Sequence, residues 1–185
     1  MLLAAIVALD AAVAALWLRP AIFWNAVAPF AAVLAYLLAI NAAGRRFRVA
    51  KEPVVAFLFT AGTFLVAWTN DRSSPIALLW PAAAFFALCT ANLVAIEAWE
   101  WRELRDGRDP PQALTRVLVR GLRVWVPLLA VASAAAAAGG RGRWYAAIAI
   151  SAAGVGALVF AGRRTSIEVR RVLVDAVLLS PAIWL

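Results

Sequence analysis

The sequence predicts an all-α, polytopic membrane protein with about seven transmembrane helices in a single domain that covers residues 1–185. Hydrophobic residues make up 65% of the chain and the mean hydropathy is +0.86, which leaves too little polar surface for a soluble domain. Apolar runs of about twenty residues recur, and that length matches the ~30 Å hydrocarbon core of a bilayer. Because these runs show no alternation of apolar and polar residues, we expect helices rather than strands.

The first predicted span lacks a basic leading segment and carries Asp10, so we interpret it as a true span and not as a signal peptide. Residues 70–75 and 139–140 are turn sequences that separate later spans. Gly154 and Gly156 indicate a close-packing face on the sixth span. The seven predicted spans cover residues 2–18, 21–42, 53–69, 75–97, 116–138, 144–162 and 169–185.

The basic residues are distributed unevenly along the chain, which has a net charge of +8. The loops after the second, fourth and sixth spans, together with the starts of the spans that follow them, contain 14 of the 18 Lys and Arg residues. The positive-inside rule therefore places these loops and the N-terminus in the cytoplasm and the C-terminus outside, as in a bacterial cytoplasmic membrane protein. We assign the charge to topology and to contact with anionic membrane lipids, and we expect no nucleic-acid partner.

The chain has no histidine and a single cysteine, Cys89, which excludes a histidine base, a histidine metal ligand and an internal disulfide. Polar groups within predicted spans are functional candidates by default. Asp10, Asn92 and Asp175 belong to this class. Arg171 precedes Asp175 by one helical turn, so we expect these two side chains to pair.

The stretch at residues 92–109, NLVAIEAWEWRELRDGRD, contains five of the ten acidic residues. If the fourth helix continues through it, Asn92, Glu100 and Glu103 fall within about 80° of one another at about 100° per residue. Glu97 lies off this flank but at the membrane interface, where an unpaired charge is costly. Carboxylate and amide oxygens suit Mg²⁺, so these four residues are candidate metal ligands. A charged cytoplasmic loop with local Arg-to-acid pairs is the alternative.

Across the loop, Arg116, Arg120 and Arg123 are spaced at i, i+4 and i+7 and so share one face of the fifth helix. Together with Lys51, they are candidates for binding a metal-bound diphosphate opposite the acidic flank. The alternative interpretation is that these arginines only flank a span on its cytoplasmic side.

This pattern resembles the UbiA superfamily of membrane prenyltransferases. The acidic stretch falls where the second Asp-rich motif of that family belongs, if the seven spans here correspond to its third to ninth helices. The loop at residues 45–51, followed by EPVVAFLFTAGTF, and the closing RRVLVDAVLLSP are similar to family segments. The resemblance implies a UbiA-like helical bundle that transfers an isoprenyl group from a Mg²⁺-bound prenyl diphosphate to a lipophilic acceptor.

The sequence departs from the family motif N-D-x-x-D-x-x-x-D, because Asn92 and Glu100 match it while Leu93 and Ile96 replace the inner acids. In this correspondence the first two helices and the first Asp-rich motif of the family would precede residue 1, and we expect either a misassigned start or a non-catalytic descendant of the family. A depleted half-site predicts impaired or absent catalysis. The alternatives are a non-catalytic lipid-binding or scaffold protein and a small transporter, and no catalytic residue is assigned.

Overall fold

The computed structural model describes residues 27, 31–36, 38, 51–70, 75–103, 112–161 and 165–178. Within these ranges all regular secondary structure is helical, and no strand occurs. The first predicted span, with Asp10, and most of the second lie outside the described residues.

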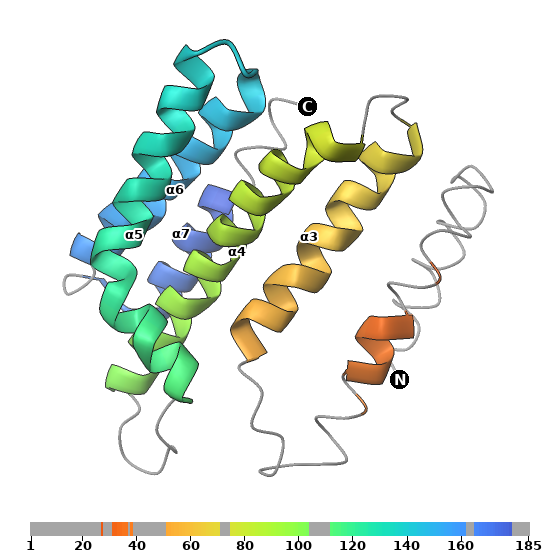
Figure 1. The fold of residues 1–185 in the computed structure, drawn as a ribbon. Helices are drawn as coiled ribbons and strands as arrows, with labels where there is room; N and C mark the ends of the chain where they lie inside the picture. The colour runs from red at the N-terminus through yellow and green to blue at the C-terminus, as the bar shows by residue number, and fades with distance from the viewer. Residues whose placement is uncertain are drawn as a thin grey trace. The chain divides into compact units, whose positions relative to one another are not determined.

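The helices are α3 (Lys51–Asn70), α4 (Pro75–Glu103), α5 (Ala113–Ala138), α6 (Arg143–Ala161) and α7 (Ile167–Leu178), as Figure 1 shows. Their positions confirm helices over the third to sixth predicted spans and over the seventh as far as Leu178, and residues 179–185 lie outside the described residues. The largest difference is at the end of α4, which continues six residues past the predicted boundary at 97. Glu100 and Glu103 therefore lie on a helix and not in a loop.

Among the described residues, three segments are long and apolar enough to cross a membrane: Ile76–Glu103, Ala113–Ala138 and Arg143–Ala161. The 28 residues of the first segment extend about 42 Å at about 1.5 Å per residue, more than the ~30 Å hydrocarbon core. The chain is therefore a helical membrane protein. A total of seven spans stays a prediction.

The chain divides into two units, which are described separately here. One unit is formed by Arg48–Thr60 and Leu79–Leu185, and it contains the first half of α3, most of α4, and α5 to α7. The other is formed by Met1–Phe47 and Ala61–Leu78, and its described part includes the second half of α3 and the first residues of α4. The helix packing, polar pairs and pocket described for α3 to α7 belong to the first unit, whereas Gly62 lies in the other.

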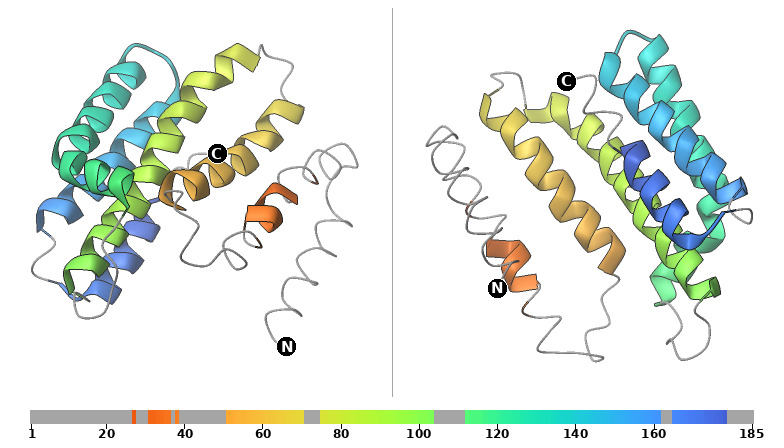
Figure 2. Two further views of the ribbon diagram at one scale, coloured as in Figure 1. Left: turned by 60° about the horizontal axis from the view of Figure 1, so that its bottom comes forward. Right: turned by 180° about the vertical axis from the view of Figure 1, so that it is seen from behind.

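Helix α4 is the buried centre of this unit. Phe85 stacks on Phe59 of α3 at 6.0 Å and lies 5.6 Å from the Trp144 ring of α6. A helix that is apolar all round needs neighbours on several sides, and Figure 2 shows α7 alongside α4 as well. Side chains buried along α4 include Leu88, Cys89, Ala91, Val94, Ala95, Ala98 and Trp99.

Helices α5 and α6 form an antiparallel hairpin joined by the glycine-rich turn that the sequence predicts. Gly140 and Gly142 have φ angles of 77° and 106°, a left-handed region that side chains with a Cβ rarely adopt. Below the turn, the side chain of Val126 on α5 is fully buried and lies 3.6 Å from the position of a Cβ on Gly156. A Cβ at this position would make an ordinary van der Waals contact, so Gly156 faces α5 without a close approach that requires glycine.

Helix α7 packs on α6 through the other predicted small residue. The Ser151 hydroxyl donates a 2.9 Å hydrogen bond to the Val177 carbonyl oxygen. A Cβ on Gly154 would lie 2.9 Å from a Val177 methyl group, which is closer than van der Waals contact allows. The structure confirms the close-packing face on α6, and it shows that Gly154 and Gly156 contact different neighbours.

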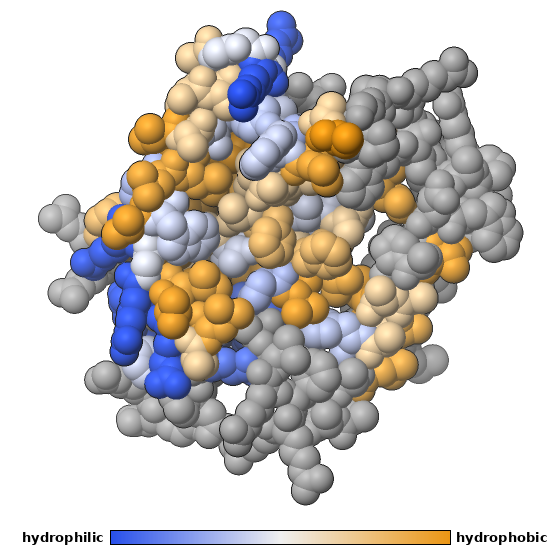
Figure 3. Space-filling model, viewed as in Figure 1, coloured by the Kyte–Doolittle hydropathy of each residue, from blue (hydrophilic) through white to orange (hydrophobic). Residues whose placement is uncertain are grey.

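The outer surface of the unit carries large apolar side chains, among them Trp80, Val117, Val131 and Phe160. Figure 3 shows hydrophobic side chains along α5, with hydrophilic side chains gathered towards its ends. An apolar band between polar ends is the pattern of a surface that faces lipid.

The α6–α7 contact generates a stability prediction. Gly154→Ala should lower the unfolding free energy by about 1–3 kcal/mol, because the stiff Val177 side chain cannot move away without shifting α7. Thermal unfolding in detergent measures this, and adding Val177→Ala should restore part of the loss. Gly62→Ala is the control: nothing lies within 4 Å of its Cβ position, so it should be neutral or stabilising. Equal effects of the two Gly→Ala changes would contradict the packing.

Candidate functional site

The acids at the end of α4 pair with bases on two other helices. Glu97 accepts from the Lys51 ammonium of α3 at an Nζ–Oε2 distance of 2.9 Å. The guanidinium of Arg171 on α7 pairs with Glu100, and that of Arg170 pairs with Glu103. These acids therefore join α4 to α3 and α7.

Arg170 is a buried charge with a full set of partners. Its side chain is only 8% exposed, and its guanidinium lies 5.5 Å from the centre of the Trp99 ring. Its Nε donates to the carbonyl oxygens of Thr165 and Ser166, at 3.1 and 3.4 Å. A buried guanidinium is tolerated only with such pairing, so Arg170 fixes the start of α7 against the end of α4.

A third polar contact joins the same two helices deeper in the unit. The Asn92 Nδ2 group donates to Asp175 Oδ1 at 3.1 Å. The contacts Glu103–Arg170, Glu100–Arg171 and Asn92–Asp175 run in opposite sequence directions on α4 and α7, and we call this antiparallel set the α4–α7 ladder. The expected pairing of Arg171 with Asp175 is wrong, because the long Arg171 side chain reaches Glu100 instead.

The start of α3 is fixed to both α4 and α5. Glu52 is 5% exposed and accepts a 2.8 Å hydrogen bond from the Thr115 hydroxyl at the start of α5. Lys51 precedes the predicted span and keeps a side chain that is 59% exposed. Partial burial lowers its pKa, but the Glu97 hydrogen bond and charge outweigh this, with smaller effects of Glu52 and Glu100, and raise the Lys51 pKa above 10.5.

The structure does not bring the predicted basic stripe to the acidic flank. Arg116, Arg120 and Arg123 lie exposed on α5, and the Arg123 guanidinium lies 5.8 Å from the Phe160 ring of α6. Of the four predicted diphosphate ligands, Lys51 is the one that contacts a predicted acid, Glu97, in the described part of the chain. The stripe and the acids therefore act at separate places.

The four predicted Mg²⁺ ligands do not converge on one point in this arrangement. Glu97, Glu100 and Glu103 each face a base from another helix, and Asn92 lies eleven residues, about 16 Å, along α4 from Glu103. Within the described ranges no group of three or more acidic or cysteine side chains is placed to hold a metal. Mg²⁺ binding by these residues stays a prediction.

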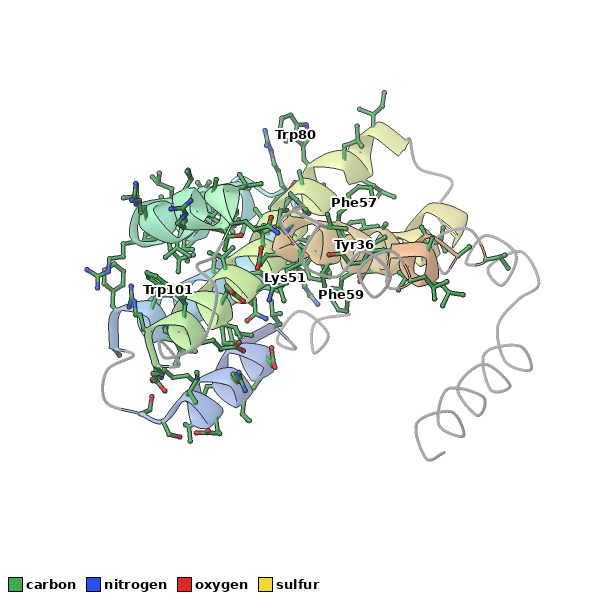
Figure 4. All side chains as sticks on the ribbon, turned by 90° about the horizontal axis from the view of Figure 1, so that it is seen from below. Tyr36, Lys51, Phe57, Phe59, Trp80 and Trp101 are labelled. Carbon is green, nitrogen blue, oxygen red and sulfur yellow. The ribbon has the colours of Figure 1, made fainter. Side chains whose placement is uncertain are left out.

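A cavity of about 290 Å³ lies between α3, α4 and α7, close to the lower end of the ~300–1,000 Å³ range of small-molecule pockets. Its wall is apolar except at the Asn92–Asp175 contact. We call it the α3–α4–α7 pocket. Figure 4 views the unit from the end where Lys51 and Trp101 lie, with Phe59 farther along α3. The lining residues are Val55, Ala56, Phe59, Cys89, Asn92, Leu93, Asp175 and Leu178.

Sequence reasoning did not identify Glu52, Thr115 or Arg170 as structural partners. Glu52 lies in the sequence Lys-Glu-Pro at the start of an apolar run, where an acid is favoured by the helix N-terminus. That signal does not reveal that the side chain is buried. Trp99 is buried, and the Arg170 guanidinium lies over its ring.

The chain has one lysine, so its pKa can be measured without ambiguity. A pH titration of the Lys51 side-chain NMR resonance should give a pKa above 10.5, and Glu97→Gln should lower it. The pair therefore contributes stability that is fully present below 10.5 and is lost as the pH rises through the raised pKa. A pKa that Glu97→Gln leaves unchanged would contradict the contact.

The α4–α7 ladder generates a second prediction. Arg170→Met should lower the unfolding free energy by about 1–3 kcal/mol, less than for a fully buried pair because Glu103 is 39% exposed. Arg102→Met is the matched control, because Arg102 is an exposed arginine on the last turn of α4. Thermal unfolding of both variants in one detergent makes the comparison. Similar losses would show that Arg170 is not an anchor.

No protein-family model, curated protein or solved structure matches this chain. The resemblance to the UbiA superfamily therefore rests on the sequence segments alone and stays a prediction. The features that bear on function are the α3–α4–α7 pocket and the partners of the acidic side chains.

Proposed function

We propose that this chain is an integral membrane protein that binds a lipophilic molecule in the α3–α4–α7 pocket and does not use its acidic helix end for catalysis. The observation that carries the proposal is the pocket itself, with apolar walls from three helices and one polar contact. Binding sites for small lipophilic molecules combine these features. Membrane lipids or a lipophilic small molecule are the ligand class.

The partners of the acids support a structural role for them. Glu100 and Glu103 face Arg171 and Arg170, which already neutralise them, and Glu97 faces Lys51. A carboxylate that holds a cation or a phosphate-bound metal would have to give up its base first. The cost of separating such pairs favours anchoring over ligand exchange.

The distribution of charge supports the cytoplasmic membrane as the location, with the basic loops inside. The contacts Lys51–Glu97, Glu52–Thr115 and Arg170–Glu103 gather the starts of α3, α5 and α7 at the end of α4. These are the helix ends that follow the predicted basic loops, so one end of the unit carries most of the arginines. This arrangement supports the orientation expected from the positive-inside rule.

A substitution that fills the pocket with a larger side chain tests the proposal. Leu93→Trp places a larger side chain on the pocket wall, and it should reduce labelling by a photoreactive long-chain alcohol about tenfold in nanodiscs. Leu128→Trp is the matched control, because Leu128 is an exposed position on α5 outside the pocket. Peptide mass spectrometry should locate the wild-type label on α3, α4 or α7. Equal labelling of both variants, or a label elsewhere, would overturn the proposal.

Prenyl transfer of the UbiA type is the second candidate. The observation that favours it is the exposed Lys51 ammonium beside Glu97, at the polar end of the unit that contains the pocket. The resemblance implies that Glu100 is a Mg²⁺ ligand, which requires it to release Arg171.

A binding assay separates the two candidates. Under prenyl transfer, purified protein should bind a labelled prenyl diphosphate only with Mg²⁺, and Glu100→Gln should weaken that binding about tenfold or more. Glu168→Gln, which changes an exposed acid at the start of α7, is the control. If Mg²⁺ has no effect on binding, the second candidate fails and the first is untouched.

A further inference from the structure

The α3–α4–α7 pocket contains a polar pair with an incomplete set of hydrogen bonds. Asn92 is 3% exposed, and its Nδ2 group donates to Asp175 Oδ1 at 3.1 Å. The Asn92 Oδ1 atom is buried and has no donor among the described residues. Because this oxygen is buried, the amide of Asn92 acts on the pocket through its Nδ2 group, which holds the Asp175 carboxylate.

Asp175 differs from the acids at the end of α4 in what faces it. Glu97, Glu100 and Glu103 each pair with a base, whereas the partner of Asp175 is a neutral amide, and within the described residues no base pairs with it. It lies opposite Asn92, about 16 Å along α4 from the polar end, on an apolar wall. Asp175 is exposed where it lines the pocket, so a ligand in the pocket can reach its carboxylate.

The chemistry of the pair defines the ligand that complements it. The Asp175 carboxylate is a negatively charged acceptor on one wall of an apolar pocket, and the Asn92 amide holds it there. A primary ammonium group supplies three donors and the opposite charge, and an alkyl chain suits the rest of the wall. An anionic headgroup would be repelled, and a neutral alcohol would bind without the charge interaction.

We infer that the α3–α4–α7 pocket binds an amphiphilic primary amine, with its ammonium group on the Asp175 carboxylate, which the Asn92 amide holds in place, and its alkyl chain against Val55, Phe59 and Leu93. This inference rests on the proposed function, because it names the ligand class of the same pocket. It assigns Asp175 and Asn92 as the residues that determine specificity.

Photolabelling of the full chain in nanodiscs tests the inference. The probes are a photoreactive long-chain primary amine and the photoreactive alcohol of the same chain length, each mapped by peptide mass spectrometry. Competition with unlabelled compound should show that the amine binds about tenfold tighter than the alcohol, as a charge-assisted hydrogen bond predicts. Asp175→Asn should remove the difference and retain labelling by the alcohol, which also shows that the variant is folded. Glu168→Gln, the control on the same helix, should retain the difference.

The labelling results separate a failure of the inference from a failure of the proposed function. Equal affinity of the amine and the alcohol for the wild-type protein overturns the inference, and so does a preference for the amine that survives Asp175→Asn. Either result leaves the proposed function standing, because the alcohol still labels the pocket. Labelling of the pocket by neither probe overturns the proposed function itself.

Discussion

The α4–α7 ladder is the interaction on which the rest of the described unit depends. Helix α4 is apolar on all sides, so hydrophobic burial alone does not determine which neighbour each face meets. The paired charges and the amide contact do determine it, because a carboxylate or guanidinium left unpaired near a membrane is far more costly than an exchanged leucine. The ladder fixes both the choice of α7 as a neighbour and its antiparallel direction.

The pocket and the polar end follow from this arrangement. The two ion pairs of the ladder and the Lys51–Glu97 pair hold the helix ends together at the end of α4. The Asn92–Asp175 contact holds α7 beside α4 farther along the helix. Between α3 and α7 the remaining wall of α4 is left with small and apolar side chains, and a cavity results. Anchoring and ligand binding are thus performed by different parts of one helix.

The helices of the described part could be predicted from the sequence, because apolar runs bounded by turn residues depend on local chemistry. The shared flank of Glu100 and Glu103 could also be predicted, since helical geometry fixes it. The interaction partners of these side chains could not be predicted from the sequence. A pairing rule within one helix assigned Arg171 to Asp175, but the packing of α7 on α4 gives Arg171 to Glu100. The stripe at Arg116, Arg120 and Arg123 was expected to lie opposite the acids across the loop, but these arginines are exposed on α5.

The ladder also has a consequence for biosynthesis. Its partners are separated by 67, 71 and 83 residues, so α4 leaves the ribosome well before α7 exists. Until then Glu100 and Glu103 have no arginine from α7, and the end of α4 must stay in the aqueous headgroup region. Synthesis of the last helix therefore completes the charge balance of the fourth, and a chain interrupted before α7 lacks the two arginines that pair with Glu103 and Glu100.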